Sequence, residues 1–355
     1  MTKIILENIS HSYDGGKTWA ISDINLTFES GRRYALLGPS GCGKTTMLKI
    51  ICGALRPTKG KIYFDDVDVT DYPPEKRNVA IVFQFPVVYR MSVLKNLLFP
   101  LMNVNIPKAE KLKKARHIAE MLGIDDLLDR PAHRLGLADK QRVSIGRALV
   151  RDVDVILLDE PMSSIEPDKR YELKRLLMEV SKDMKKTMIF VTHDQTEALT
   201  FGEKIAVMSP NGRLLQFGTF EEIYHSPAHE FVGFFIGFPG MNIIGGRVIE
   251  GGVDLGPFKL VLKEKKLPLR IGEEVKIGIR PEHIRIALSQ TEGYIPFDVV
   301  YMEDLGRRSM ILHLRNGEVL IKARISKEVS GISKVWVKIP EEHIVFFDKS
   351  GRRVA

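Results

Sequence analysis

Apolar and polar positions in the first part of the chain follow the spacing of β-strands. Apolar side chains alternate with polar ones over residues 4–9 and 19–28, and residues 14–16 between them are Asp-Gly-Gly, a turn sequence. This pattern predicts two strands joined by a hairpin turn. Residues 33–37 and 155–158 are continuous apolar runs, typical of strands buried on both faces. The overall pattern therefore predicts an α/β fold.

The spacing of apolar positions becomes helical between residues 91 and 128. Leucine, isoleucine and alanine recur there three and four positions apart, the repeat of one helix face. Apolar strands precede and follow this stretch at residues 79–83 and 153–160. We therefore expect a helical insert, at about residues 86–150, between two strands of one sheet.

A second domain is expected after Tyr224. A helix predicted at residues 228–236 runs into the breaker sequence 237–240, and short period-two strands separated by Gly, Pro and charged turns follow. With 355 residues the chain is long for a single core. We predict an α/β domain at residues 1–236 and a small β-barrel domain at residues 237–355.

A glycine-rich loop lies between the apolar strand 33–37 and a predicted helix. It fits the pattern G-x-x-x-x-G-K-[ST], in which glycines let backbone N–H groups at a helix N-terminus approach a polyphosphate. Lys44 would place its ammonium near the β- and γ-phosphates, and the Thr45 hydroxyl would complete the shell of a Mg²⁺ ion. The alternative is a strand-to-helix turn that binds nothing. The candidate phosphate-binding residues are Gly38, Pro39, Ser40, Gly41, Cys42, Gly43, Lys44, Thr45 and Thr46.

Polar side chains end further apolar strands, where ligands of open α/β sheets bind. Asp159 is a candidate Mg²⁺ ligand, and Glu160 is a candidate base that orients and deprotonates an attacking water. Gln84 can bind Mg²⁺ or that water, and His193 can donate a hydrogen bond to a γ-phosphate. Taken singly, a glutamine at a strand end is usually incidental and a histidine there is more often structural.

Tyr13 comes just before the predicted hairpin turn. An exposed aromatic ring on this side of the phosphate loop can stack on an adenine ring. A tyrosine on a β-surface is more often simple packing, and the residue alone does not decide between the two.

Composition and charge narrow the class of protein. The net charge is +8, but the positive residues are dispersed and do not alternate with aromatic ones, so we expect no nucleic-acid partner. No apolar run approaches the roughly 18 residues of a membrane span, and the chain begins with a strand-like sequence, so we expect a cytoplasmic protein without an export signal. The two cysteines, Cys42 and Cys52, form neither a disulfide framework nor a metal motif.

Together these residues resemble the ATP-binding subunit of an ABC transporter over nearly the whole chain. The matching motifs are Tyr13 for the adenine-stacking aromatic, residues 38–45 for Walker A, Gln84 for the Q-loop, residues 156–160 for Walker B and residues 191–194 for the switch histidine. The resemblance implies ATP and Mg²⁺ as cofactors. It implies catalytic roles for Glu160, His193, Lys44 and Gln84, and Mg²⁺ ligation by Thr45, Gln84 and Asp159.

The C-terminal part resembles importer ATPases of the maltose and glycerol-phosphate type, which carry tandem OB-like segments. The matching stretches are Phe-Ile-Gly-Phe-Pro-Gly-Met-Asn at 235–242 and Gly-Ile-Arg-Pro-Glu-His at 278–283. The resemblance implies a carbohydrate or polyol as transported substrate, transmembrane permease subunits as partners, and an extracytoplasmic substrate-binding protein as an indirect partner. It implies a location at the cytoplasmic face of the membrane, with the apolar residues 85–94 meeting the permease. Polyamine and iron importers share this architecture and are the alternative.

Two stretches depart from the family pattern. Leu135, Gly136, Leu137, Ala138 and Asp139 stand where the family has the signature L-S-G-G-Q, and residues 163–166 read Ser-Ser-Ile-Glu where it has S-x-L-D. In the family the signature faces the γ-phosphate held by the other subunit of a dimer. A missing hydroxyl and an added carboxylate weaken that contact. We expect an asymmetric heterodimer with a second ATPase subunit; the alternatives are a homodimer and a nucleotide-binding regulatory subunit with little hydrolysis.

Overall fold

The computed structural model describes residues 2–163, 165–184, 186–263, 268–306, 309–326 and 331–354. The chain forms two compact units, Met1–Phe220 and Glu221–Ala355. In the described ranges, every helix is too short or too polar to cross a lipid bilayer. Both cysteines are buried and unpaired.

The N-terminal unit contains an antiparallel sheet of four strands in the order β2-β1-β4-β5. Strands β1 and β2 pair antiparallel, which confirms the predicted hairpin. Gly15 and Gly16 take positive φ angles of 74° and 98° in the connection, a conformation that favours glycine. The strands are β1 (Ile4–His11), β2 (Ile21–Phe28), β4 (Lys59–Phe64) and β5 (Val67–Asp68).

The second sheet of this unit has six strands in the order β10-β9-β3-β8-β7-β6. All neighbours pair parallel except β10 with β9, and β7 and β8 are buried along their whole length, as their apolar runs predict. Parallel strands bring their carboxyl ends to one edge, so the segments after β3, β6, β7 and β8 meet there. The strands are β3 (Arg33–Leu37), β6 (Val79–Val82), β7 (Val155–Asp159), β8 (Thr187–Thr192), β9 (Lys204–Met208) and β10 (Leu214–Gly218).

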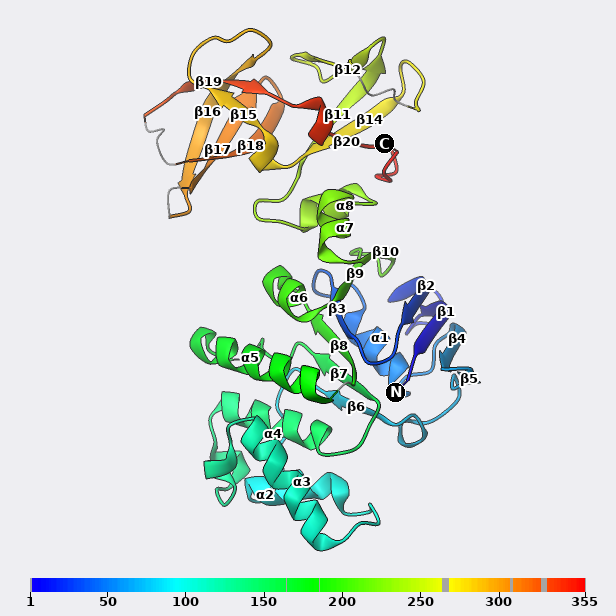
Figure 1. Ribbon diagram of the computed structural model, residues 1–355. Coiled ribbons are helices and arrows are strands. Elements are labelled where there is room, and N and C mark those ends of the chain that lie inside the picture. The colour runs from blue at the N-terminus through cyan, green and yellow to red at the C-terminus, as the bar shows by residue number, and fades with distance from the viewer. Residues whose placement is uncertain are drawn as a thin grey trace. The chain divides into compact units, whose positions relative to one another are not determined.

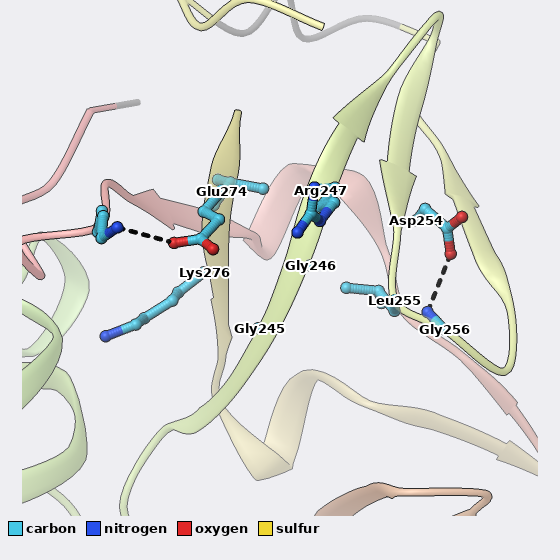
Figure 2. A pocket seen from close by; sticks show the side chains of 10 residues that line it. Gly245, Gly246, Arg247, Asp254, Leu255, Gly256, Glu274 and Lys276 are labelled. Carbon is cyan, nitrogen blue, oxygen red and sulfur yellow. Dashed lines mark hydrogen bonds and ion pairs between the residues drawn. The ribbon is translucent and has the colours of Figure 1, made fainter. Parts of the chain in front are cut away.

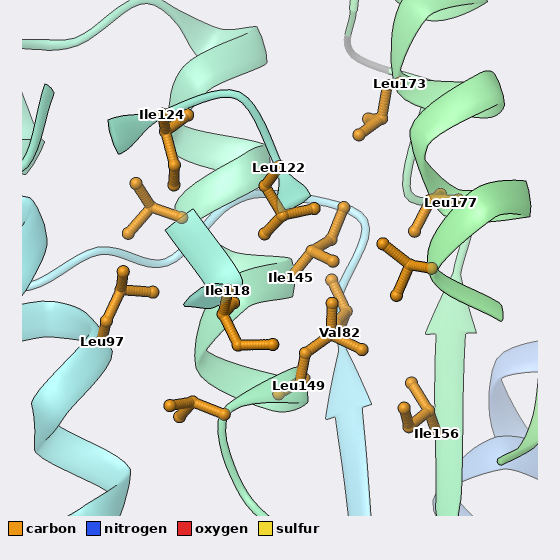
Figure 3. Packing of buried hydrophobic residues seen from close by; sticks show 14 of the residues in the cluster. Val82, Leu97, Ile118, Leu122, Ile124, Ile145, Leu149, Ile156, Leu173 and Leu177 are labelled. Atoms are coloured by element: carbon orange, nitrogen blue, oxygen red, sulfur yellow. The ribbon is translucent and has the colours of Figure 1, made fainter. Parts of the chain in front are cut away.

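Helices follow several strands of this sheet and form an insert between two of them. Helix α1 (Lys44–Ile51) follows β3, α5 (Pro167–Met184) follows β7, and α6 (Gln195–Phe201) follows β8. Between the paired strands β6 and β7 the chain forms α2 (Val93–Leu98), α3 (Lys108–Met121) and α4 (Leu137–Leu149), the predicted helical insert (Figure 1). Residues of these helices, of β6 and β7 and of α5 share one apolar core (Figure 3).

The C-terminal unit is built mainly of β-strands, as expected. It has two five-stranded antiparallel sheets, in the orders β13-β12-β11-β14-β20 and β15-β19-β16-β17-β18. Apolar residues of both sheets form one core, which includes Ile277 and Phe346 from the first sheet and Phe297 and Leu312 from the second. The strands are β11 (Asn242–Ile249), β12 (Gly252–Asp254), β13 (Lys259–Val261), β14 (Glu274–Ile279), β15 (Arg285–Ala287), β16 (Ile295–Asp304), β17 (Ser309–Asn316), β18 (Val319–Ser326), β19 (Lys334–Lys338) and β20 (Val345–Phe347).

The division between the compact units lies earlier in the chain than the predicted domain boundary at 236/237. Helices α7 (Phe220–His225) and α8 (Glu230–Phe235) pack with the β-rich unit, because residues of that unit donate hydrogen bonds to carbonyl groups of the two helices. The Met241 amide donates to the Gly233 carbonyl at 3.1 Å, and the buried Arg280 donates to the carbonyls of Gly233 and Tyr224 at 3.0 and 2.8 Å. The change in composition at residue 237 therefore does not coincide with the limit of the packed unit.

Candidate functional site

The glycine loop between β3 and α1 is shaped by glycines that have no room for a side chain. A Cβ on Gly43 would lie 2.4 Å from the Ala20 carbonyl oxygen, and Gly43 caps α1 with a φ of 94°. A Cβ on Gly38 would lie 2.7 Å from the Cys42 sulfur. By contrast, Gly41 faces open space and is exposed. The loop thus packs tightly on one side and presents backbone on the other, as a phosphate cradle at a helix N-terminus requires.

Lys44 lies inside this loop with its side chain only 5% exposed. Its ammonium donates to the carbonyls of Gly38 and Pro39 at 2.9 and 2.8 Å, and lies 4.0 Å from a Glu160 carboxylate oxygen. Burial raises the pKa of the neighbouring Cys42 thiol, so this group stays neutral. Cys42 therefore carries no negative charge that would offset the ammonium of Lys44.

Thr45 and Asp159 meet at the carboxyl edge of the sheet. The Thr45 hydroxyl donates to Asp159 Oδ1 at 3.1 Å, and burial raises the pKa of Asp159. Hydroxyl and carboxylate oxygens are ligands that Mg²⁺ accepts, and Mg²⁺ commonly binds one or two carboxylates together with substrate phosphates. Within the described parts of the chain, no group of three or more His, Cys, Asp or Glu could hold a metal. This pair therefore fits a Mg²⁺ ion whose remaining ligands are phosphate oxygens and water.

Glu160 lies at the centre of the other polar contacts. His193 Nδ1 lies 3.2 Å and Gln84 Nε2 lies 3.5 Å from its Oε2 atom, on the side away from the Lys44 contact to Oε1. Glu160 has a positive φ of 43°, a strained conformation for a non-glycine residue, and its amide is fixed on the Val191 carbonyl at 3.0 Å. The structure thus brings together three residues from three different strand ends. The side chain of Gln84 contacts Glu160, whereas the predicted Mg²⁺ ligands Thr45 and Asp159 contact each other.

Tyr13 lies beside the loop with 64% of its surface exposed. Its hydroxyl oxygen lies 3.1 Å from the Thr46 hydroxyl oxygen. The rings of Tyr13 and His11 pack edge to face, with their centroids 4.6 Å apart. The ring is therefore held in place from two sides while much of its surface stays open.

Residues 135–139 lead into α4, which begins at Leu137. Gly136 is the N-cap without a side-chain hydrogen bond, and a Cβ there would meet no atom within 4 Å. Leu137 is 55% exposed, and Asp139 lies 3.9 Å from Arg142 in the first turn. Among the described residues, no hydrogen bond or ion pair joins this stretch to the glycine loop of the same chain. The helix start presents an apolar side chain and a carboxylate.

Two residues that the sequence analysis missed hold this framework. Arg77 is 3% exposed and donates to the carbonyls of Ile50 and Ile51, the last residues of α1, at 2.8 and 3.0 Å. Ser163 Oγ donates to the Glu160 carbonyl at 3.0 Å. In the sequence, Arg77 is simply a charged residue next to an apolar strand. Many charged surface residues have the same position, so the sequence does not indicate that Arg77 is buried. A serine shortly after the strand end is equally common.

The chain matches two protein families described as "ABC transporter", at residues 21–163, and "MalK OB fold domain", at residues 237–284. It is 38% identical to the trehalose/maltose import ATP-binding protein MalK of Thermococcus litoralis, over 94% of this chain and 95% of the relative. It is 35% identical to the sn-glycerol-3-phosphate import ATP-binding protein UgpC of Escherichia coli K12, over the whole length of both.

Solved structures agree with the fold of the first unit. The cbiO1 protein of Clostridium perfringens, part of the ABC transporter complex cbiONQ, superposes with a TM-score of 0.58 and 30% identity over 62% of this chain and 89% of its own. A dimeric ATP-binding cassette, MJ0796, in a post-hydrolysis state with ADP and Pi superposes with a TM-score of 0.55 and 28% identity. The match covers 61% of this chain and 98% of that chain.

Proposed function

The chain belongs to the family of ABC transporter ATP-binding subunits that carry a MalK-type OB-fold domain, and from this premise we propose that it hydrolyses ATP to energise an importer for a carbohydrate or polyol. The observation that carries the proposal is the arrangement at the carboxyl edge of the sheet. There Lys44 and His193 both approach Glu160, at 4.0 and 3.2 Å, while Thr45 and Asp159 form an oxygen pair 3.1 Å apart. The substrate class rests on the two relatives, which are named as importers of trehalose/maltose and of glycerol phosphate.

Each residue of the site has a distinct proposed role. Lys44 would exchange its loop carbonyls for phosphate oxygens, and the ring of Tyr13 would stack on the adenine. Mg²⁺, held by Thr45 and Asp159, would offset negative charge on the phosphates. Glu160 would take the proton of the water that attacks the γ-phosphate, because its carboxylate is fixed by contacts on both oxygens.

His193 and Gln84 would act around that carboxylate. His193 is 53% exposed, so its ring can turn toward a γ-phosphate while remaining near Glu160. Gln84 would connect Glu160 with the permease, because the chain runs directly from Gln84 into an exposed apolar stretch. Its second proposed role is Mg²⁺ ligation. Phe85, Val87 and Tyr89 are 68, 56 and 39% exposed, and we propose that they contact permease subunits at the cytoplasmic face of the membrane.

We further propose that the chain works in an asymmetric dimer with a second, different ATPase subunit. The start of α4 is the supporting observation, because it presents Leu137 and Asp139 where a γ-phosphate of the opposite subunit would lie. At about 5 Å and an effective dielectric near 20, a carboxylate repels a phosphate charge by roughly 3 kcal/mol. The same observation supports a second candidate, a nucleotide-binding regulatory subunit with little hydrolysis.

ATP turnover of the purified chain separates these possibilities. Glu160→Gln lowers any turnover by at least about a hundredfold if Glu160 is the base. Restoring the signature with Gly136→Ser, Leu137→Gly, Ala138→Gly and Asp139→Gln raises turnover by about tenfold or more if the signature is limiting. Gly245→Ser is a matched control, since a Cβ there also meets nothing within 4 Å. Brisk turnover by the unmodified chain contradicts the asymmetric dimer, and no turnover with the restored signature favours the regulatory subunit.

A further inference from the structure

A short sequence occurs twice in the C-terminal unit. Residues 279–284 read Ile-Arg-Pro-Glu-His-Ile and residues 339–344 read Ile-Pro-Glu-Glu-His-Ile. Both form a single 3₁₀ turn, η5 (Pro281–His283) and η6 (Glu341–His343), after a residue of extended backbone, and both continue into a short strand. The two copies place their histidines in equivalent positions.

The two histidines of the repeat meet in space. The rings of His283 and His343 are stacked, with centroids 3.9 Å apart and planes inclined by 10°. They line a cavity of about 250 Å³ within the C-terminal unit, together with Tyr224, His225, Arg280 and Arg353.

The carboxylates next to the histidines contact other side chains, and the charge of Glu282 partly opposes the lowering of the pKa of His283. Glu282 accepts from the Tyr224 hydroxyl, and Glu342, which lines the cavity, lies 3.5 Å from the Arg285 guanidinium. Arg280 is 3% exposed, and its guanidinium lies on the Tyr224 ring at 3.9 Å. Burial, and then the neighbouring His343, lower the pKa of His283. The cavity thus gathers positive and protonatable groups with Glu342 as the one carboxylate among its described lining residues.

A larger cavity of the same unit differs in charge. It has a volume of about 540 Å³ and lies over β11, β12 and β14, with Arg247, Asp254 and Glu274 around it (Figure 2). Its charges are of both signs. Glu274 pairs with Lys349 at 3.5 Å, and Lys276 pairs with Glu230 at 2.7 Å. Internal ion pairs therefore leave this cavity without a clear excess of either charge.

We propose that the cavity between the two histidine turns binds a small tetrahedral oxyanion, either free or as the phosphoryl group of a metabolite. Two stacked imidazoles can both carry a proton only if a negative charge offsets their repulsion, and Arg280 and Arg353 add positive charge around them. The volume is just below the range of sites for larger organic ligands, so it suits a small ion. In the described residues no group of three or more His, Cys, Asp or Glu could hold a metal.

Sulfate binding to the full chain tests the proposal, since sulfate keeps its charge across the relevant pH range. ADP is kept saturating so that the phosphate loop is filled. The dissociation constant is expected to rise by about tenfold between about pH 6 and about pH 8, because the imidazoles lose the protons that hold the anion. His283→Gln and His343→Gln should each weaken binding at the lower pH by about tenfold and reduce the pH dependence, and the double variant should remove it. The matched control His117→Gln, on the exposed face of α3, should change neither value.

A second measurement needs no variant. Sulfate should raise the apparent pKa of two histidine ring resonances in the NMR spectrum of the unmodified chain. Inorganic phosphate and glucose 6-phosphate then identify the source: tighter binding of the ester indicates a phosphorylated metabolite, and tighter binding of phosphate indicates the free ion. The proposal is overturned if sulfate affinity is the same at both pH values, or if no histidine resonance responds.

Discussion

Replacing Asp159 by asparagine should stabilise the nucleotide-free protein. Asp159 is 5% exposed, and its carboxylate accepts from the neutral Thr45 hydroxyl at 3.1 Å, while Lys44 is turned to loop carbonyls. Burial raises the pKa of this carboxyl because the charged form loses hydration. Asparagine keeps the acceptor oxygen and removes the charge, so the gain in free energy of unfolding at neutral pH is about 1 to 3 kcal/mol.

The pH dependence fixes the sign of this effect. A carboxyl whose pKa is raised by folding stabilises the fold fully below its ordinary value of 3.8, and that contribution is lost as pH rises through the folded value. The difference between Asp159→Asn and the unmodified chain should therefore be largest near neutral pH and vanish in acid. Saturating Mg²⁺ and ATP should reverse the order, because the unmodified chain binds the metal more tightly.

Thermal unfolding over a range of pH measures this prediction, with an expected rise in midpoint of a few degrees. Asp152→Asn is the control, because Lys186 at 2.7 Å lowers the pKa of that exposed carboxyl and its removal should not stabilise. A destabilising charge on Asp159 is ruled out if Asp159→Asn is no more stable than the unmodified chain near neutral pH, or if its gain in stability persists unchanged in acid.

Three further predictions concern the frame of the site, the nucleotide and the C-terminal unit. Arg77→Met should lower the free energy of unfolding by about 3 kcal/mol or more, because buried carbonyls at the end of α1 lose their donor; Arg56→Met, at an exposed ion pair, should cost under about 1 kcal/mol in the same denaturant titration. Tyr13→Ala should weaken ATP binding by about tenfold, and Tyr13→Phe should change it little, since only the latter keeps the stacking ring; a nucleotide titration in which both behave alike would contradict the adenine contact. In sulfate-free buffer the free energy of unfolding should fall as pH drops through 6.5, the ordinary pKa of His283, because the unfolded chain then binds more protons. His283→Gln should reduce this slope, and an unchanged slope would contradict the lowered pKa of His283.

Local patterns were sufficient to predict much of the fold. Continuous apolar runs mark the buried strands β7 and β8, and alternation marks β1 and β2, since side-chain periodicity follows directly from backbone geometry. The glycine loop could be predicted for a similar reason. A Cβ at Gly43 would lie 2.4 Å from the Ala20 carbonyl oxygen, so this position requires glycine, and a required glycine can be seen in the sequence.

Contacts between distant residues could not be predicted in this way. Arg77 binds carbonyls of Ile50 and Ile51, and nothing in its own neighbourhood indicates that it will be buried. The stacked rings of His283 and His343 depend on how two turns pack in the C-terminal unit. The limit of the first compact unit also depends on packing, because Arg280 draws the carbonyl groups of α7 and α8 to the β-rich unit.

The most direct test of ATP hydrolysis at this site is turnover by a mixture of two variants of the chain. One is the unmodified chain, whose glycine loop and Glu160 are intact; the other carries the restored signature at residues 136–139 together with Glu160→Gln, so it can complete a partner's site but cannot hydrolyse its own ATP. We expect the mixture to hydrolyse ATP about tenfold faster or more than either chain alone. Equal and negligible turnover in the mixture and in both separate chains would contradict it.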